Sequence, residues 1–361
     1  MKQTFFIAEI GKGFIQTKED KTVSEYLQNA KELVLKAKES GADAAKFQIH
    51  HLEDEQLNVH VVSPHFKESD RYAWVKRNEE STPFESFWKP IIQYCKELNI
   101  TFMVTPMSRG AAQILDPVDI PIWKIGSGDM LDFVLIDYLS KKNKPIIISS
   151  GMSTFDEVKK AVTFVEKRTK EVTLLHCVSK YPCPLEELNL QTITYYKDQF
   201  PDIEIGFSDH SLGFEGVLIA VALGATVIEK HFSTSREHWG SDHKVSLLPE
   251  EFSEMVKEVR AIENEEEKKK EILEKANDIL LGKNQKIMNK EEEKFRFYFR
   301  KNLVASRDLT AGTTISPEHI YAMRPKAEFN AYPSQDYEQI IGKKTKKDLK
   351  KYDFLNEENI E

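Results

Sequence analysis

The chain has little cysteine and no long apolar run, and both shortages narrow the class of protein. Its only cysteines are Cys95, Cys177 and Cys183. An odd number without metal-binding spacing favours reduced thiols over a disulfide framework. No apolar stretch approaches the roughly 18 residues of a membrane-spanning helix, and no secretory signal is recognisable. These absences predict a cytoplasmic protein with no membrane partner, and Cys177, in a strand-like run, as a core residue.

Positive charge is also in short supply. Lys and Arg number 51 against 59 Asp and Glu, which gives a formal net charge of −8. This balance argues against nucleic acid as the main partner, so basic residues gathered at one site would indicate a small anionic ligand. With 361 residues, of which 40% are hydrophobic, the chain can bury one large core and carry a small second domain.

Eight strand-like segments alternate with helical patterns through the first part of the chain. They span residues 4–10, 44–49, 101–105, 123–126, 145–149, 172–177, 204–207 and 227–231. Eight such repeats are typical of a closed (β/α)8 barrel, a TIM barrel of the α/β class, with a doubly wound open sheet as the alternative. Polar clusters follow nearly every strand. They favour the barrel, because an open sheet gathers its ligand contacts at one switch point.

The chain is expected to divide into three parts. Residues 1–262 form the barrel, 263–298 a charged helical linker, and 299–361 a compact β-rich module. Dense charges of both signs at 265–275 and 290–294 indicate solvated helix faces and imply no partner. The last part is too small for a second catalytic domain, which predicts a lid, an interaction module or a dimerisation arm.

The long excursion over residues 50–81, after the second strand, has two interpretations. In one, the excursion shapes a pocket at the barrel's carboxyl end. This interpretation fits its acidic residues Glu53, Asp54 and Glu55 and its aromatic residues Tyr72 and Trp74. A mobile surface loop is the alternative.

His210 and His231 give the sharpest chemical signal. His210 follows the seventh strand and His231 ends the eighth. Because the carboxyl ends of neighbouring parallel strands meet at one rim, the two imidazoles are expected to converge. A lone histidine is more often a structural side chain. Two at equivalent strand ends, with Asp242 nearby, indicate half of a divalent metal site whose other positions are open to water and substrate.

Small hydroxyl groups and two lysines are expected at the same rim. The side chains at the strand ends include Lys46, Thr105, Lys124, Ser127, Ser149, Ser179 and Ser208. Short donors and two point charges at this density describe a phosphate site. A metal beside a phosphate site, with carboxylates at Asp129 and Asp242, suits addition to a carbonyl, and hydrolysis is the alternative.

Several short strings in this order resemble one family nearly end to end. They include KIGSG at 124–128, GFSDHSL at 206–212 and KHF at 230–232. The chain resembles the sialic acid synthase family, enzymes that condense phosphoenolpyruvate with an N-acetylated hexose. Residues 300–305 and 323–325 look like that family's antifreeze-like (SAF) domain. The resemblance implies a (β/α)8 barrel followed by a small SAF domain.

The resemblance also implies a role for each residue at the rim. It implies that a divalent ion, manganese or magnesium, is held by His210 and His231. The residues implied to be catalytic are Asp129, Lys46 and Lys124. Those implied to bind the phosphate and carboxylate of phosphoenolpyruvate are Lys46, Thr105, Lys124, Ser127, Ser149, Ser179 and Ser208. Those implied to contact the sugar are Gln48, Tyr181, Asp242 and Arg324. In the family, the counterpart of Arg324 reaches over the other subunit's barrel, so a domain-exchanged homodimer is expected.

Three departures from the family pattern concern the acceptor sugar more than the reaction. Residues 12–16 replace an Asn-His-Asn-Gly-like loop, Ser179 stands where some members have asparagine, and the segment after Pro325 lacks a glycine-rich continuation. The acceptor therefore stays open between N-acetylmannosamine, its 6-phosphate and a 6-deoxy diacetamido sugar. Two other functions stay open as well: a metal-dependent aldolase or hydrolase on the same barrel, and a non-catalytic carbohydrate-binding protein.

Overall fold

Eight parallel strands form a closed barrel in chain order. The structure is a computed structural model and describes residues 3–62, 70–276, 278–326 and 330–361. The strands are β1 (Phe5–Gly11), β2 (Ala44–Ile49), β3 (Thr101–Pro106), β4 (Ile122–Ile125), β5 (Ile146–Ser149), β6 (Val172–Cys177), β7 (Glu204–Asp209) and β8 (Val227–His231). Pairing of β1 with β8, from Phe5 opposite Val227 to Glu9 opposite His231, closes the barrel. The predicted barrel is confirmed, and each strand ends close to its predicted position.

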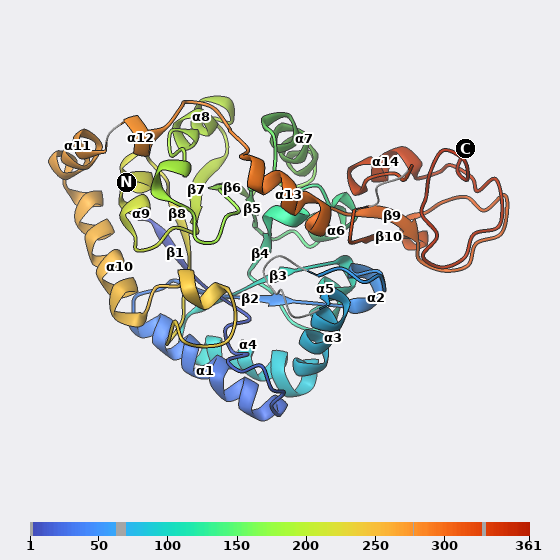
Figure 1. The fold of residues 1–361 in the computed structure, drawn as a ribbon, viewed down its shortest axis with the longest axis horizontal. Helices are drawn as coiled ribbons and strands as arrows, with labels where there is room; N and C mark the ends of the chain where they lie inside the picture. Colours follow the sequence, from blue (N-terminus) through green and yellow to red (C-terminus); the bar gives the residue numbers. More distant parts are fainter. Residues whose placement is uncertain (1–2, 63–69, 277, 327–329) are drawn as a thin grey trace.

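Helices surround the barrel (Figure 1). They are α1 (Val23–Glu39), α4 (Lys89–Glu97), α5 (Arg109–Ile114), α6 (Phe133–Ser140), α7 (Phe155–Glu166), α8 (Thr192–Gln199), α9 (Glu215–Ala222) and α10 (Pro249–Asn264). Local sequence explains where such helices start. In α1, for example, Thr22 and Glu25 form a reciprocal capping box, which satisfies two backbone N–H groups at the helix start. The buried side of α1 is apolar, and its packing on the barrel supplies most of the helix's stability.

The interior of the barrel changes from apolar to polar along the strands. A small buried cluster inside the barrel consists of Ile7, Ala44, Met103, Ile147, Leu175 and Val227. Two residues further along the same strands stand Glu9, Lys46, Thr105, Ser149, Cys177 and Glu229. Because side chains alternate along a strand, each of these polar residues points the same way as its apolar neighbour. The polar layer therefore rests on an apolar layer and faces the carboxyl ends of the strands, which we call the mouth.

The excursion after β2 contains two helices, α2 (Leu52–Glu55) and α3 (Arg71–Ser81). A short π-helical turn, Phe84–Trp88, then leads into α4. Residues 63–69 of the excursion lie outside the described part. The remainder of the excursion carries residues of the cavity at the mouth, which supports the pocket-shaping interpretation for that part.

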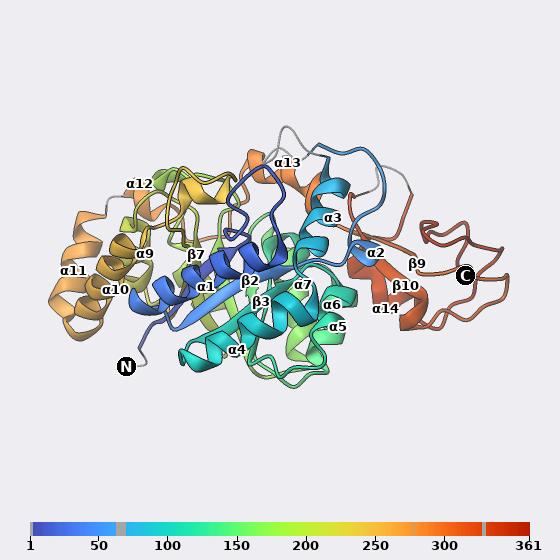
Figure 2. The same cartoon turned by 90° about the horizontal axis from the view of Figure 1, so that it is seen from below.

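The C-terminal part crosses the molecule and ends in a small β module. It contains α11 (Glu266–Lys275), α12 (Asp278–Leu281), α13 (Lys290–Phe299), β9 (Asn302–Ala305), β10 (Ile320–Met323) and α14 (Tyr337–Ile340). In Figure 2, α11 and the β module lie at opposite ends of the molecule, with α13 between them. Strands β9 and β10 form an antiparallel pair. The small β-rich module is present as expected, and helices α11, α12 and α13 lie within residues 263–299.

One charged segment is less solvated than predicted. Helix α11 has no buried side chain, as expected, whereas Glu292 of α13 is fully buried. Its carboxylate accepts hydrogen bonds from the backbone N–H groups of Met152 (2.9 Å) and Ser179 (2.8 Å). The interpretation of 290–294 as a purely solvated face is therefore wrong at this residue, because α13 docks on the mouth through it.

Candidate active site

A cavity of about 210 Å³ opens at the mouth and receives side chains from all eight strands. Helices α3 and α13 and the C-terminal module complete its wall. Every residue predicted from the sequence for the metal, phosphoenolpyruvate or sugar lines this cavity: Lys46, Gln48, Thr105, Lys124, Ser127, Asp129, Ser149, Ser179, Tyr181, Ser208, His210, His231, Asp242 and Arg324. The structure thus brings the whole predicted set together, although their individual roles stay predictions.

Four charged side chains form what we call the floor cluster: Glu9, Lys46, Lys124 and Glu229. Carboxylate oxygens of Glu229 lie 3.5 Å from the ammonium of Lys46 and 3.6 Å from that of Lys124. Lys46 also pairs with Glu9 at 2.6 Å. Burial would raise the pKa of Glu229, but Lys124 and Lys46 lower it to about 2. Both lysines therefore lie at one end of the barrel and share a buried carboxylate.

The sequence interpretation placed Glu9 at a strand end without giving it a role, and it did not include Glu229 among the site residues. Glu229 stands two residues before His231 on β8, so strand alternation alone places both side chains on the same side of the strand. That spacing was the available signal. Glu9 likewise follows the inward-facing Ile7 by two residues.

Hydroxyl groups gather beside the floor cluster. Lys124 donates a hydrogen bond to Ser149 (2.7 Å), and Lys46 donates one to Thr105 (3.1 Å). Gly151 allows two further hydroxyls to approach. A Cβ atom at Gly151 would lie 2.2 Å from the Ser179 oxygen and 2.6 Å from the Ser127 oxygen, so any larger residue would push these groups apart. Hydroxyls, a backbone N–H group and two lysines at this density can hold an anion.

His210 and His231 converge as predicted, with ring centroids 5.5 Å apart. Nδ1 of His210 lies 2.8 Å from the carbonyl oxygen of Val178. A carbonyl can only accept, so Nδ1 carries a proton, and in the neutral ring Nε2 is the nitrogen that has a lone pair. The hydroxyl of Tyr181 lies 2.9 Å from that Nε2. Burial lowers the pKa of His231 and so favours its neutral form.

These two imidazoles form an incomplete set of ligands for a metal. Among the residues that the structure describes, no group of three or more His, Cys, Asp or Glu side chains is arranged to hold an ion. Burial favours the neutral imidazole at His231, and Nε2 of His210 would be free for a metal once the Tyr181 hydroxyl moves away. This pair fits an ion that takes its other ligands from water and substrate.

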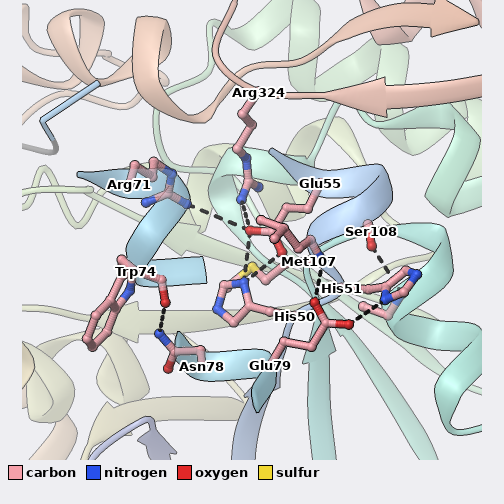
Figure 3. A network of polar contacts seen from close by, with 12 residues as sticks. His50, His51, Glu55, Arg71, Trp74, Asn78, Glu79, Met107, Ser108 and Arg324 are labelled. Carbon is pink, nitrogen blue, oxygen red and sulfur yellow. Dashed lines mark hydrogen bonds and ion pairs between the residues drawn. The ribbon is translucent and has the colours of Figure 1, made fainter. Parts of the chain in front are cut away.

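Arg324 and Asp129 join the C-terminal module to the mouth. The Arg324 side chain is buried, and its guanidinium lies 2.5 Å from Asp129. It also lies 3.2 Å from Glu55 (Figure 3). Lys301 lies 3.0 Å from the same oxygen of Asp129. Asp129, predicted to be catalytic, is thus neutralised by two cations. In the single chain, Arg324 reaches the barrel of its own chain.

The excursion contributes residues that sequence reasoning missed. Glu55 of α2 accepts a hydrogen bond from His50 at 2.6 Å and faces Arg71 of α3 at 3.9 Å. Figure 3 shows Arg71 and Arg324 approaching Glu55 from two different elements. Lys12, in the loop after β1, and Arg71 both line the cavity. The only signal for Lys12 was its departure from the family loop.

A barrel with this polar mouth, walled by a C-terminal β module, has the architecture of an enzyme that handles a small anionic substrate. The sequence profile of the NeuB family matches residues 33–271, and that of the SAF domain matches residues 300–361. The chain belongs to the NeuB family and is an enzyme of the synthase type that its curated relatives are named for.

Two relatives and one solved structure show how far the similarity extends. The N-acetylneuraminate-9-phosphate synthase of Mus musculus is 32% identical over 361 residues, covering 99% of this chain and 92% of the relative. The N,N'-diacetyllegionaminic acid synthase of Campylobacter jejuni is 32% identical over 368 residues, covering 99% of this chain and 100% of the relative. The spore coat polysaccharide biosynthesis protein spsE of Bacillus subtilis is 28% identical, with a TM-score of 0.79 and coverage of 99% and 95%. The resemblance stated from the sequence is therefore confirmed.

In the part of the chain that the structure describes, no helix combines the length and the apolar character that a bilayer crossing requires.

Proposed function

We propose that this enzyme condenses phosphoenolpyruvate with the open-chain aldehyde of an N-acetylated hexose, forming a nonulosonic acid and releasing phosphate. The names of the two relatives support this product class, since both are synthases of acidic nine-carbon sugars. The observation that carries the proposal is the meeting of the floor cluster and the two imidazoles in one cavity. In the proposal, the floor cluster serves as the anion site and the two imidazoles beside it as the metal site.

The floor cluster suits phosphoenolpyruvate. Burial would lower the pKa of Lys46, but Glu229 and Glu9 raise it, so the ammonium stays charged. An incoming carboxylate or phosphate would meet this charge together with the hydroxyls of Thr105, Ser149, Ser127 and Ser179. Charge-assisted hydrogen bonds of this kind orient an anion as well as bind it.

His210 and His231 would hold the divalent ion, manganese or magnesium. Bound there, the ion supplies Lewis acidity that draws charge from the aldehyde oxygen. Gln48, Tyr181, Asp242 and Arg324 would contact the sugar. Gln48 now donates to Glu9 at 2.7 Å, so its amide is already held beside the floor cluster.

The proposed reaction forms one carbon–carbon bond and breaks one carbon–oxygen bond. The methylene carbon of phosphoenolpyruvate forms a bond to the aldehyde carbon, and the aldehyde oxygen becomes a hydroxyl by taking up a proton. Water adds to the cationic enol carbon and loses a proton. The tetrahedral intermediate expels phosphate by cleavage of its carbon–oxygen bond. Lys46 and Lys124 stabilise the anionic groups throughout, because preorganised charges act strongly in a site with little water.

The proposal includes a homodimer that exchanges its C-terminal modules. The C-terminal part makes buried polar contacts with the barrel through Arg324, Lys301 and Arg300. Lys301 donates a hydrogen bond to Asp132 (2.7 Å), and Arg300 donates one to the carbonyl oxygen of Ser127 (3.0 Å). In an exchanged dimer the same contacts would form between subunits, and the wall of each cavity would come from the partner copy.

The direct test is turnover with both substrates. The purified chain, with Mn²⁺ or Mg²⁺, is given phosphoenolpyruvate and a panel of N-acetylated hexoses, and released phosphate and product mass are measured. We expect phosphate release that requires the sugar and a product heavier than the sugar by the pyruvate unit. Phosphate release without sugar would indicate a hydrolase instead, and no turnover with any sugar would contradict the proposed function.

The metal assignment has its own test. His210→Ala should lower metal-dependent turnover by more than about 100-fold, since it removes a direct ligand. Mn²⁺ binding, followed by electron paramagnetic resonance of the free ion, should weaken in parallel. His60→Ala is the control, because the side chain of His60 is 82% exposed. Full turnover and unchanged Mn²⁺ binding in His210→Ala would exclude this site.

A further inference from the structure

Two basic side chains at the mouth, Lys12 and Arg71, each have a buried nitrogen without a hydrogen-bond partner in the described part of the chain. Among the described residues, no hydrogen-bond partner reaches Nζ of Lys12 or Nε of Arg71, and both nitrogens are inaccessible to solvent. Arg71 as a whole is only 7% exposed. Both side chains line the cavity. Because a buried cation is costly unless an anion or a hydrogen-bond acceptor meets it, this pair points to a ligand.

Lys12 lies against an aromatic wall. Its ammonium is 5.9 Å from the ring centroid of Trp74, which pairs with Trp239 at 5.5 Å. Burial lowers the pKa of Lys12 well below its ordinary value, against the opposing effects of Glu55 and Asp242. An anion placed next to Lys12 would restore the charged form.

Arg71 is held in place but not neutralised. It is the first residue of α3, and its guanidinium stacks over the ring of Phe299 at 4.8 Å. Its nearest carboxylate, Glu55, is 3.9 Å away and already accepts hydrogen bonds from Arg324 (3.2 Å) and His50 (2.6 Å). Burial lowers the pKa of Arg71 to about 10, and the charge of Arg324 adds to this effect.

The floor cluster differs from this pair in one decisive respect. There, Lys46 and Lys124 share Glu229, and Glu9 adds a second carboxylate. Arg71 instead shares the Glu55 carboxylate with Arg324, and Lys12 lies beside Trp74 of the same helix as Arg71. Arg324 and Asp242 are the residues assigned to the acceptor sugar. The two buried nitrogens without hydrogen-bond partners among the described residues are therefore on the acceptor side.

We propose that Lys12 and Arg71 bind an anionic substituent, a phosphate monoester or a carboxylate, carried by the acceptor sugar. A fork of guanidinium donors beside a lysine point charge recognises either group. This inference rests on the proposed function, and it assigns a purpose to the departure of residues 12–16 from the family pattern. It also names the class of acceptor, which the two relatives leave open, since one is named for a phosphorylated product and the other is not.

The experiment compares three matched acceptors: N-acetylmannosamine, its 6-phosphate and its C6 carboxylate. With phosphoenolpyruvate and Mn²⁺, we expect kcat/KM for one of the anionic sugars to exceed that for the neutral sugar by about 100-fold or more, as two charge-assisted contacts allow. The preferred anion separates a phosphate from a carboxylate ligand. Equal kcat/KM for all three sugars, with turnover intact, would overturn the inference and leave the proposed function standing.

Variants then assign the effect to the two cations. Lys12→Gln and Arg71→Gln should each reduce the ratio of kcat/KM between the anionic and neutral sugars by about 10-fold or more. The ratio is the readout, because a folding defect lowers both values together. Lys76→Gln is the matched control: it removes the same charge from α3, but its side chain is 57% exposed and outside the cavity. A ratio unchanged in both cavity variants would overturn the assignment.

Calorimetry separates this inference from the reaction itself. Binding of the anionic sugar to the full chain with Mn²⁺, without phosphoenolpyruvate, should weaken in Lys12→Gln and Arg71→Gln and not in Lys76→Gln. This result would decide the inference even if no sugar were turned over, which would contradict only the proposed reaction. If the variants instead lost affinity for phosphoenolpyruvate, the two cations would belong to that substrate and the inference would fall.

Discussion

His176 shows, at the scale of one residue, how burial controls charge in this fold. Nε2 of His176 donates a hydrogen bond to the carbonyl of Leu188 at 2.7 Å, and its ring stacks on Phe207. The residue is outside the cavity lining. Burial lowers the pKa of His176 to about 3. It therefore stays neutral in the folded protein at neutral and mildly acidic pH.

This lowered pKa predicts a pH-dependent stability. Below about pH 6.5 the unfolded chain protonates this imidazole while the folded chain does not, so acid favours unfolding. His176 should lower the free energy of unfolding by about 2 kcal/mol between neutral pH and pH 5. Urea unfolding of wild type and His176→Gln at pH 7 and pH 5 measures this, since the other histidines titrate in both proteins. Identical pH dependence in the two proteins would contradict the assignment.

Sequence reasoning found most of the site residues at the strand ends, although not Glu229, and it missed Arg71, which depends on tertiary contacts. His210, His231, Lys46 and Lys124 could be predicted because the repeat of strand and helix fixes where strand ends meet. Arg71 could not, because nothing in the local sequence shows that α3 folds back over the mouth. Nor does any local pattern show whether a buried nitrogen finds a partner.

At the scale of elements, α13 is the helix that joins the barrel to the C-terminal module. Glu292 closes a capping box with Asn289 at the start of α13 and also accepts the backbone N–H groups of Met152 and Ser179. Arg296 of the same helix pairs with Glu157 of α7 at 2.6 Å. The helix therefore holds the backbone of the loops after β5 and β6, which carry Met152 and Ser179 at the predicted phosphate site.

Removing the Glu292 carboxylate should loosen this junction. Glu292→Ala leaves two buried backbone N–H groups without acceptors and breaks the capping box, which should cost about 3 kcal/mol or more of unfolding free energy. Glu293→Ala, at the exposed neighbouring position, should change it little. Equilibrium unfolding in urea compares the two. Equal stability of both variants would show that α13 does not depend on this contact.

The helices were less predictable than the strands. A dense run of charges such as that of α13 predicts a helix, but it does not predict which face of the helix is buried. Glu292 is the same residue type as Glu291 and Glu293, and only its packing against the barrel distinguishes it. The boundaries of the three parts, at residues 262 and 299, stay predictions.

At the scale of the whole molecule, the position of Arg324 raises the question of which barrel it covers. In an exchanged dimer, each cavity would combine the histidines of one subunit with Arg324 of the other. Mixing His210→Ala with Arg324→Ala subunits should then restore activity, because each mixed dimer contains one intact cavity. With equal amounts of both subunits and random pairing, about half of the dimers are mixed, and each mixed dimer has one intact cavity out of two. The sample therefore contains about a quarter of the wild-type number of intact cavities.

The control is each variant alone, carried through the same unfolding and refolding steps, and the readout is phosphate release that depends on the sugar. No rescue in a sample proven to contain mixed dimers would mean that each C-terminal module serves its own barrel.

The apolar layer beneath the floor cluster has a kinetic consequence. Ile7, Met103 and Leu175 close the barrel below, so a ligand reaches Lys46 and Lys124 through the mouth that the C-terminal module helps to wall. If the lysines bind phosphoenolpyruvate and Arg324 contacts the sugar, as proposed, phosphoenolpyruvate should bind before the sugar. The barrel would then impose an order on binding and release: the sugar side binds last and is released first.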